Sequence, residues 1–399
     1  MAKTRRRVPR RTRSGARSKV ALVCAGGGIT GAVYEIGCLR ALEDLLDRSV
    51  ADLDLYVGVS GGAFVTSLLA NDVSPREMYD AVAAPRRGAL SDPTGALFRV
   101  GLGEFWRRSL RAPRVVTEAL LARFAGEGRN WSDVAWALFE LLPAGLLDNS
   151  GIEEYLSALF ASRGRGNEFA GLSKPLHVIA VDLDNGEAVD FGPGGGHEAT
   201  VSKAVQASTA LPGLYRPVRI GGRDYVDGGV KKTAHINLAI QSGADLVICV
   251  NPIVPIDNRS GALSSHLSSK GITYVLDQVL RIALHGRMQY GLERYKAEHP
   301  EVDILLIEPS RDDLRMFSYN IMRYSARKIV AAHAYRSTLQ AFSAREDEYR
   351  RLLRRHGIAL TDPGRLPHVP EMSPYGSRLA RALSGSLDIL SSALRRKAG

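Results

Sequence analysis

The sequence predicts an α/β fold, in which a mostly parallel central sheet carries helices on both faces and a helical C-terminal extension follows. Short apolar runs bounded by Gly, Asp or Pro alternate with helical patterns, an order that favours parallel strands covered on both sides. With 399 residues, of which 45% are hydrophobic and 24% charged, the chain has enough apolar material for a sizeable core. The runs expected to form strands are 20–24, 53–59, 176–183, 246–250 and 304–307.

Composition excludes several other classes of protein. The 40 glycines cluster without a repeat, which argues against a collagen-like or low-complexity chain. Three scattered cysteines, Cys24, Cys38 and Cys249, are too few for a disulfide framework or a zinc site, and they favour a reducing compartment. No uncharged apolar run reaches about 18 residues, and the first residues are basic rather than apolar. We therefore expect a cytoplasmic protein, with peripheral attachment to a membrane as a further option.

The net charge of +11 is concentrated at the two ends of the chain. Residues 1–34 contain nine basic side chains and no acid, so residues 1–18 read as a basic arm, either disordered or attracted to an anionic membrane surface. No motif that reads nucleic acid follows, so no specific nucleic-acid partner is expected. Near the C-terminus, a basic amphipathic helix is predicted over 376–399, either packed on the body or anchored at a membrane interface. Its apolar face would consist of Leu379, Leu383, Leu387, Leu390 and Leu394.

A glycine-rich turn directly follows the first predicted strand. Gly26-Gly27-Gly28-Ile29-Thr30-Gly31 matches G-x-G-x-x-G and opens a helix. Dinucleotide binding would also need an acidic residue at the end of the second strand, where this chain has Tyr56-Val57-Gly58-Val59-Ser60. The free amides and the helix dipole at such a turn suit a phosphate or a developing oxyanion equally well.

A second motif, Gly58-Val59-Ser60-Gly61-Gly62, matches the nucleophile elbow G-x-S-x-G between a strand and a helix. The glycines meet the steric demand of a serine held on a tight turn. A third motif, Asp227-Gly228-Gly229, is either an ordinary hairpin turn or an aspartate presented on a turn. The late histidines sit in helical or charged surroundings and favour surface or packing roles over that of a catalytic base; they are His285, His299, His333, His356 and His368.

Together with Ala207-Ser208-Thr209-Ala210-Leu211-Pro212, these motifs resemble the patatin-like phospholipases in order and spacing, from about Lys19 to about Pro255. The resemblance implies a three-layer α/β fold and a Ser-Asp dyad without histidine. Ser60 would be the nucleophile, Asp227 the general base and acid, and the amides of Gly27 and Gly28 the oxyanion hole. The supporting motif glycines would be Gly26, Gly31, Gly58, Gly61, Gly62, Gly228 and Gly229. One departure is Thr30, where the family commonly carries Arg or Lys.

The resemblance also implies a domain organisation and a substrate. Residues 19–345 would form the acyl hydrolase domain, with a helical insert over 72–147 that holds Trp106, Trp131 and Trp136 as core helices or as a lipid-accepting cap. A charged helix and Pro-rich linker would follow over 346–375. The expected substrate is a phospholipid or another acyl ester, cleaved by phospholipase A or lysophospholipase chemistry through an acyl-enzyme.

No metal or other cofactor is expected. Asp182 and Asp184 favour loop capping over calcium binding. Three alternatives stay open at this point: an α/β-hydrolase esterase with a histidine base, a nucleotide-binding protein that uses the Gly26 turn, and a lipid-binding scaffold without turnover.

Overall fold

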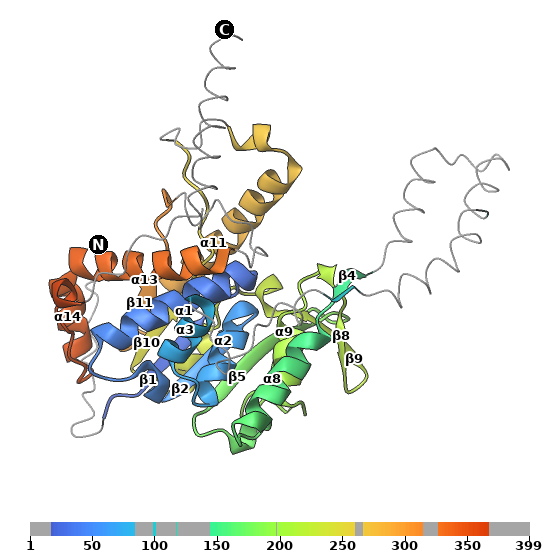
Figure 1. Ribbon diagram of the computed structural model, residues 1–399, viewed down its shortest axis with the longest axis horizontal. Helices are drawn as coiled ribbons and strands as arrows, with labels where there is room; N and C mark the ends of the chain where they lie inside the picture. Colours follow the sequence, from blue (N-terminus) through green and yellow to red (C-terminus); the bar gives the residue numbers. More distant parts are fainter. Residues whose placement is uncertain are drawn as a thin grey trace, which may run out of the picture.

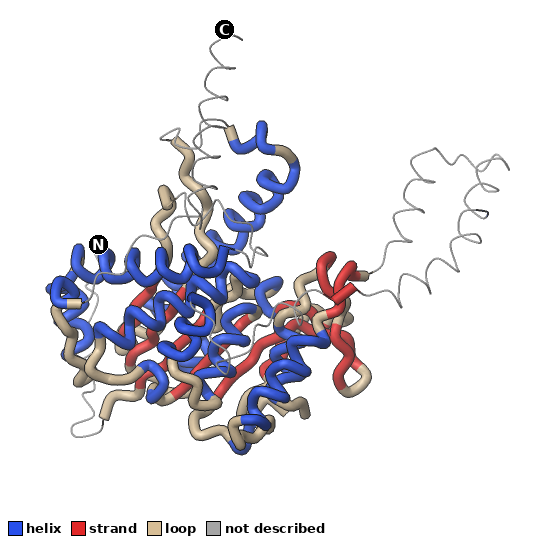
Figure 2. Tube along the Cα trace, viewed as in Figure 1, coloured by secondary structure: helices blue, strands red, loops and turns tan. Residues whose placement is uncertain are grey.

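The computed structural model describes residues 17–83, 99–100, 117, 144–196, 198–259, 266–313 and 326–366. Within these ranges helices and strands alternate along the chain (Figures 1 and 2). The helices are α1 (Gly28–Leu45), α2 (Gly61–Ala70), α3 (Pro75–Ala83), α8 (Ser150–Ser162), α9 (Val201–Ser208), α10 (Ile236–Gln241), α11 (Ile272–Glu298), α13 (Arg327–Ala344) and α14 (Glu346–Arg354). The strands are β1 (Val20–Cys24), β2 (Leu55–Val59), β3 (Arg99–Val100), β4 (Gly145–Asp148), β5 (Leu176–Asp182), β6 (Ala188–Asp190), β7 (Gly213–Tyr215), β8 (Val218–Ile220), β9 (Arg223–Asp227), β10 (Leu246–Val250) and β11 (Asp303–Ile307).

The central sheet has the strand order β11-β10-β1-β2-β5-β9-β8, with β6 paired to β5 off this path. The five strands from β11 to β5 run parallel, whereas β6 and β9 each pair antiparallel with β5, and β8 pairs antiparallel with β9. A small second sheet joins β3, β4 and β7. Parallel strands place their carboxyl ends at one edge, so the turns after β1 and β2 meet there, which is where open α/β sheets bind ligands.

Successive side chains of the central strands point to opposite faces of the sheet and pack into two separate apolar cores. Val20, Leu22 and Cys24 of β1 pack with α1, α2, α8, α9 and α13 on one face of the sheet. Ala21 and Val23 of the same strand pack with α10 and α11 on the opposite face. Because both faces are covered, the strands are apolar on both sides and read as unbroken apolar runs in the sequence. The result is the predicted three-layer arrangement with a mostly parallel sheet (Figure 1).

Most of the predicted segments that fall within the described residues are confirmed. β1 and β10 coincide with the runs 20–24 and 246–250, and β2, β5 and β11 differ from their predicted runs by one or two residues at an end. The predicted basic arm, the three tryptophans of the insert, the linker beyond 366 and the C-terminal leucines lie outside the described residues. Among the described helices, none combines the length and the apolar character needed to cross a bilayer.

Candidate active site

Ser60 stands on a sharp turn between β2 and α2. Its backbone has φ 53° and ψ −123°, a positive-φ conformation that is rare and strained for a residue with a side chain. The neighbouring glycines leave no room for a Cβ; an alanine at Gly61, for example, would place its Cβ 2.5 Å from the carbonyl oxygen of Gly28. The strained turn and the small neighbours hold the Ser60 hydroxyl at the start of α2, as the elbow motif predicts.

The glycine turn after β1 lies directly against this elbow. The first bond within α1 runs from the Gly31 amide to the Gly27 carbonyl at 2.9 Å, so the amides of Gly27 and Gly28 precede the hydrogen-bonded part of the helix. Gly28 has φ 60°, a left-handed conformation that glycine adopts without strain. Both residues line the same cavity as Ser60. Two helix N-termini, α1 and α2, therefore point positive dipole ends toward one place.

Asp227 ends β9 and reaches the same cavity from the other side. Asp227 is paired in register with Ala180 of β5, and β5 is the second strand from β1 in the sheet. The Asp227 amide donates to the Ala210 carbonyl at 3.0 Å. Its side chain, only 3% exposed, accepts a hydrogen bond from the Gly229 amide at 2.7 Å and lines the same cavity as Ser60. Burial raises the pKa of Asp227 to about 6, while the neighbouring Ser60 side chain and the Gly229 amide act to lower it.

The Asp-Gly-Gly segment is not the hairpin turn of the open alternative. The hairpin between β8 and β9 turns at Gly221 and Gly222, upstream of Asp227, and residues 228–230 form a short 3-10 turn after the strand. Gly228 packs its Cα against the carbonyl of Ile179, and Gly229 supplies the amide that binds Asp227. The structure thus gives these two motif glycines separate tasks beside the aspartate.

Ser208, the last residue of α9, connects the two halves of the site. Its hydroxyl, fully buried, accepts a hydrogen bond from the Ser60 amide at 2.9 Å and donates one to the Ile179 carbonyl of β5 at 2.6 Å. Two residues later, the Ala210 carbonyl accepts from the Asp227 amide. The segment that follows α9 therefore fixes the backbones of both site residues. The local sequence around Ser208 carries no signal of this role.

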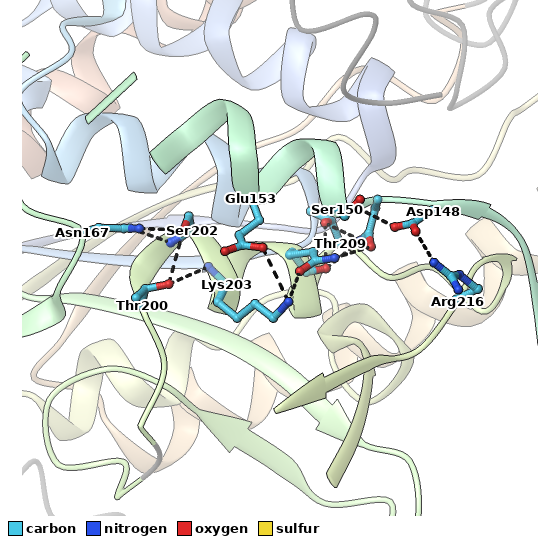
Figure 3. A network of polar contacts seen from close by, with 11 residues as sticks. Asp148, Ser150, Glu153, Asn167, Thr200, Ser202, Lys203, Thr209 and Arg216 are labelled. Carbon is cyan, nitrogen blue, oxygen red and sulfur yellow. Dashed lines mark hydrogen bonds and ion pairs between the residues drawn. The ribbon is translucent and has the colours of Figure 1, made fainter. Parts of the chain in front are cut away.

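A polar network fixes α9 itself against α8 (Figure 3). At the start of α8, Asp148 caps the helix through the Ser150 amide at 2.8 Å and pairs with Arg216. The Asn149 amide group donates to the Gln206 carbonyl at 2.7 Å, near the end of α9. Lys203 of α9 bridges Gln206 and Glu153 of α8. These contacts between the start of α8 and α9 hold in place the helix that carries Ser208.

One apolar cavity of about 190 Å³ opens around the serine, the aspartate and the glycine turn. Apolar side chains on one face of α1 and of α2 form two of its walls, and α3, α8 and α11 add others. Those on α1 and α2 are Ile29, Ala32, Val33, Ile36, Phe64 and Leu68. Charged residues in the lining are Asp227 and, from α11, Asp277 and Arg281, which pair with each other at 2.8 Å. Such a lining suits a hydrocarbon chain better than a nucleotide.

The late histidines that the structure describes lie elsewhere. His285 contacts Gln289 and Glu308, His333 pairs with Asp313, and His356 bonds Asp303. His299 pairs with Glu301, His368 is outside the described residues, and no described histidine lines the Ser60 cavity. Thr30 is buried in α1.

No group of three or more His, Cys, Asp or Glu side chains that could hold a metal ion occurs among the described residues. Asp182 instead accepts from the Asp184 amide at 3.0 Å and pairs with Arg223, as expected of a residue that stabilises its turn.

The chain resembles known proteins in two kinds of comparison, one with solved structures and one with sequence families. Three solved structures resemble the chain at low identity. VipD from Legionella pneumophila is 15% identical, over 82% of this chain and 67% of that one, with a TM-score of 0.35. The type III effector ExoU of Pseudomonas aeruginosa is 14% identical, over 83% and 54%, with a TM-score of 0.34. Human GIVD cytosolic phospholipase A2, bound to methyl gamma-linolenyl fluorophosphonate, is 13% identical, over 85% and 60%, with a TM-score of 0.35. The chain spans between about half and two thirds of the length of these proteins.

The family comparison is the more specific of the two. The sequence model of the family described as patatin-like phospholipase matches residues 22–240, a stretch that runs from β1 through α10 and contains the serine, the aspartate and both glycine turns. This stretch is more than half of the 399 residues. The chain therefore belongs to the patatin-like phospholipase family, a family of lipid hydrolases.

Proposed function

We propose that this chain hydrolyses the acyl esters of phospholipids or lysophospholipids through a Ser60–Asp227 dyad. The observation that carries the proposal is that Ser60 and the buried Asp227 line one apolar cavity together with Gly27 and Gly28, with the Ser60 side chain close enough to lower the pKa of Asp227. Nucleophile, base and oxyanion donors then surround one point, and the apolar walls accept the acyl chain.

The first half-reaction forms an acyl-enzyme. The Ser60 oxygen attacks the ester carbonyl carbon while its proton passes to the Asp227 carboxylate, and the Gly27 and Gly28 amides bind the oxyanion of the tetrahedral intermediate. As the intermediate collapses, the bond to the leaving oxygen breaks and protonated Asp227 returns its proton to that oxygen. An alcohol leaves, and the acyl group stays on Ser60.

Water completes the cycle by the same route. Asp227 takes a proton from water as the hydroxyl oxygen attacks the acyl carbon, and it then protonates the Ser60 oxygen as the fatty acid leaves. An exposed aspartate is a weak base for a hydroxyl group. The pKa of about 6 that burial confers on Asp227 brings its proton affinity closer to what both transfers need, while leaving it ionised at neutral pH.

The test compares the wild-type chain with Ser60→Ala and Asp227→Asn on a soluble p-nitrophenyl ester and on phosphatidylcholine. Because a dyad acts as a unit, both variants should lose about 10³-fold or more in kcat. An alkyl fluorophosphonate should label the wild type. It should label Asp227→Asn more slowly than the wild type, and it should not label Ser60→Ala. Full activity of Asp227→Asn would overturn the assignment of the base.

The remaining alternatives make different predictions in the same assays. A scaffold without turnover would resist the fluorophosphonate. A nucleotide-binding protein would keep its properties in Ser60→Ala and would be protected by nucleotide against thermal unfolding. A histidine-dependent esterase would lose activity in a His285 or His333 variant as fully as in Ser60→Ala, although neither residue lines the cavity.

A further inference from the structure

Helix α11 exposes an apolar stripe that the described parts of the chain leave uncovered. Ile272, Leu276 and Val279 are 69%, 60% and 55% exposed, and the exposed Ala283, Gly286 and Tyr290 continue the row. At about 100° per residue these six positions fall within about 80° of one another. Buried Arg281, Met288 and Leu292 occupy the opposite side of the helix and face the protein. An exposed apolar row of this length on a folded domain marks a surface that meets another phase or molecule.

Among the described residues of α11, the N-terminal part of the stripe has no exposed charge beside it, whereas exposed Arg287, Glu293 and Arg294 flank its C-terminal end near Tyr290. Between residues 272 and 286 of this described helix no charged side chain is exposed, because Asp277 and Arg281 are partly or fully buried and pair with each other. A helix that pairs with another helix through such a row usually carries charged residues beside it. The absence of charge over this stretch suits the acyl region of a bilayer better than a protein partner.

The stripe is continuous with the cavity. Leu280, 42% exposed, is at once part of the apolar surface of α11 and part of the cavity lining, and Leu284 lies one turn further into the lining. Figure 1 shows the N-terminal part of α11, drawn in gold, extending beyond the layers that enclose the sheet. A lipid at this face would therefore need to move only along one helix to reach Ser60.

We propose that the face of α11 formed by Ile272, Leu276 and Val279 docks onto the acyl region of a phospholipid bilayer and delivers lipid along Leu280 to the cavity. The delivery rests on the proposed acyl hydrolase function, whereas the docking does not. Contact with the hydrocarbon of the bilayer drives this binding, and attraction to lipid charge does not. The chain should therefore bind neutral phosphatidylcholine vesicles, and high salt should not release it.

The test uses the full-length chain with Ser60→Ala, so that binding is measured without turnover. Sedimentation with neutral phosphatidylcholine vesicles is compared between this chain and the same chain carrying Ile272→Gln, Leu276→Gln and Val279→Gln. Leu280 is left intact because it lines the cavity. Since all three side chains are exposed, folding is unaffected, and the partition coefficient should fall at least about tenfold. Leu146→Gln with Leu183→Gln, at residues that are 59% and 52% exposed elsewhere, is the matched control and should bind as before.

A parallel measurement separates docking from catalysis. With Ser60 restored, the triple variant should hydrolyse a soluble p-nitrophenyl ester at the wild-type rate but phosphatidylcholine vesicles at least about tenfold more slowly. If the wild type did not hydrolyse the soluble ester at all, the proposed function would be wrong, whereas the vesicle-binding result would still stand.

Three results would overturn the docking proposal. The first is that the triple variant binds neutral vesicles as well as its parent. The second is that wild-type binding requires anionic vesicles and disappears in high salt. The third is that the wild type is a dimer that the triple substitution splits, with neither form binding vesicles. The last result would assign the stripe to a second copy of the chain.

Discussion

Replacement of Asp227 by Asn should stabilise the protein while it abolishes turnover. The carboxyl group is fully buried, and its pKa is raised from 3.8 to about 6, with desolvation as the largest cause. The folded state therefore holds the proton more tightly than the unfolded state. Stability from this group is fully present below pH about 3.8 and is lost as the pH rises through about 6. At neutral pH the native protein carries a buried charge that burial disfavours.

The magnitude follows from the two pKa values. At about 1.4 kcal/mol for each pH unit between 3.8 and about 6, the buried charge costs about 3 kcal/mol at pH 7.5 and about 1 kcal/mol at pH 4.5. Asn retains the oxygen that accepts from the Gly229 amide, and its amide group can donate to the Ser60 oxygen. The variant should thus gain up to about 3 kcal/mol at pH 7.5, and the gain should shrink to about 1 kcal/mol at pH 4.5.

Urea unfolding of both proteins at pH 4.5, 6 and 7.5 measures this difference, with Asp184→Asn as a control. Asp184 lies in the turn after β5 with its side chain exposed, so its replacement should leave the free energy of unfolding within about 0.5 kcal/mol of the wild type at every pH. A gain in Asp227→Asn that is absent at pH 7.5, or equal at pH 4.5 and 7.5, would refute the reasoning from a buried charge.

Three further outcomes are expected. For a soluble ester, kcat/KM of the wild type should fall about tenfold per pH unit below pH about 6, where Asp227 is protonated, and level off above it; a flat profile down to pH 5 would contradict this base. Ser208→Ala should lower kcat about 10- to 100-fold with little change in KM, because the strained Ser60 turn loses its anchor, whereas Ser67→Ala, also buried in this layer, should spare kcat. Gly61→Ala should lower kcat by forcing the elbow away from the glycine turn, while Gly166→Ala, which meets open space, should match the wild type in steady-state assays.

The strands of the sheet could be predicted because their environment leaves a local trace. A parallel strand buried on both faces must be apolar at every position, so 20–24 and 246–250 were recognisable without any alternation. The helical pattern over 319–342 likewise predicts a helix. α13 occupies the part of that stretch from Arg327 onward, and residues 314–325 lie outside the described part.

Ser60 could be proposed from a local pattern, since strand, glycines and helix lie within a few residues of it. Asp227 could be proposed only through a family resemblance, because its place depends on the antiparallel register of β9 on β5, which no short pattern reports. The role of Ser208 could not be predicted from a short pattern either, because its two hydrogen bonds join it to residues 148 and 29 positions away in the sequence. The exposed stripe of α11 leaves no clear trace in the sequence, because the buried side of the helix, which includes Arg281, is no more apolar than the exposed side.

The antiparallel end of the sheet has a consequence for how the enzyme could be silenced. Ser60 follows an interior strand held on both sides, whereas Asp227 ends a short hairpin whose outer strand, β8, is the margin of the sheet. Local melting of that hairpin would withdraw the aspartate and leave the serine, its turn and the parallel core in place. Inactivation by mild heating is then expected at temperatures where most of the protein's backbone amides are still protected from exchange.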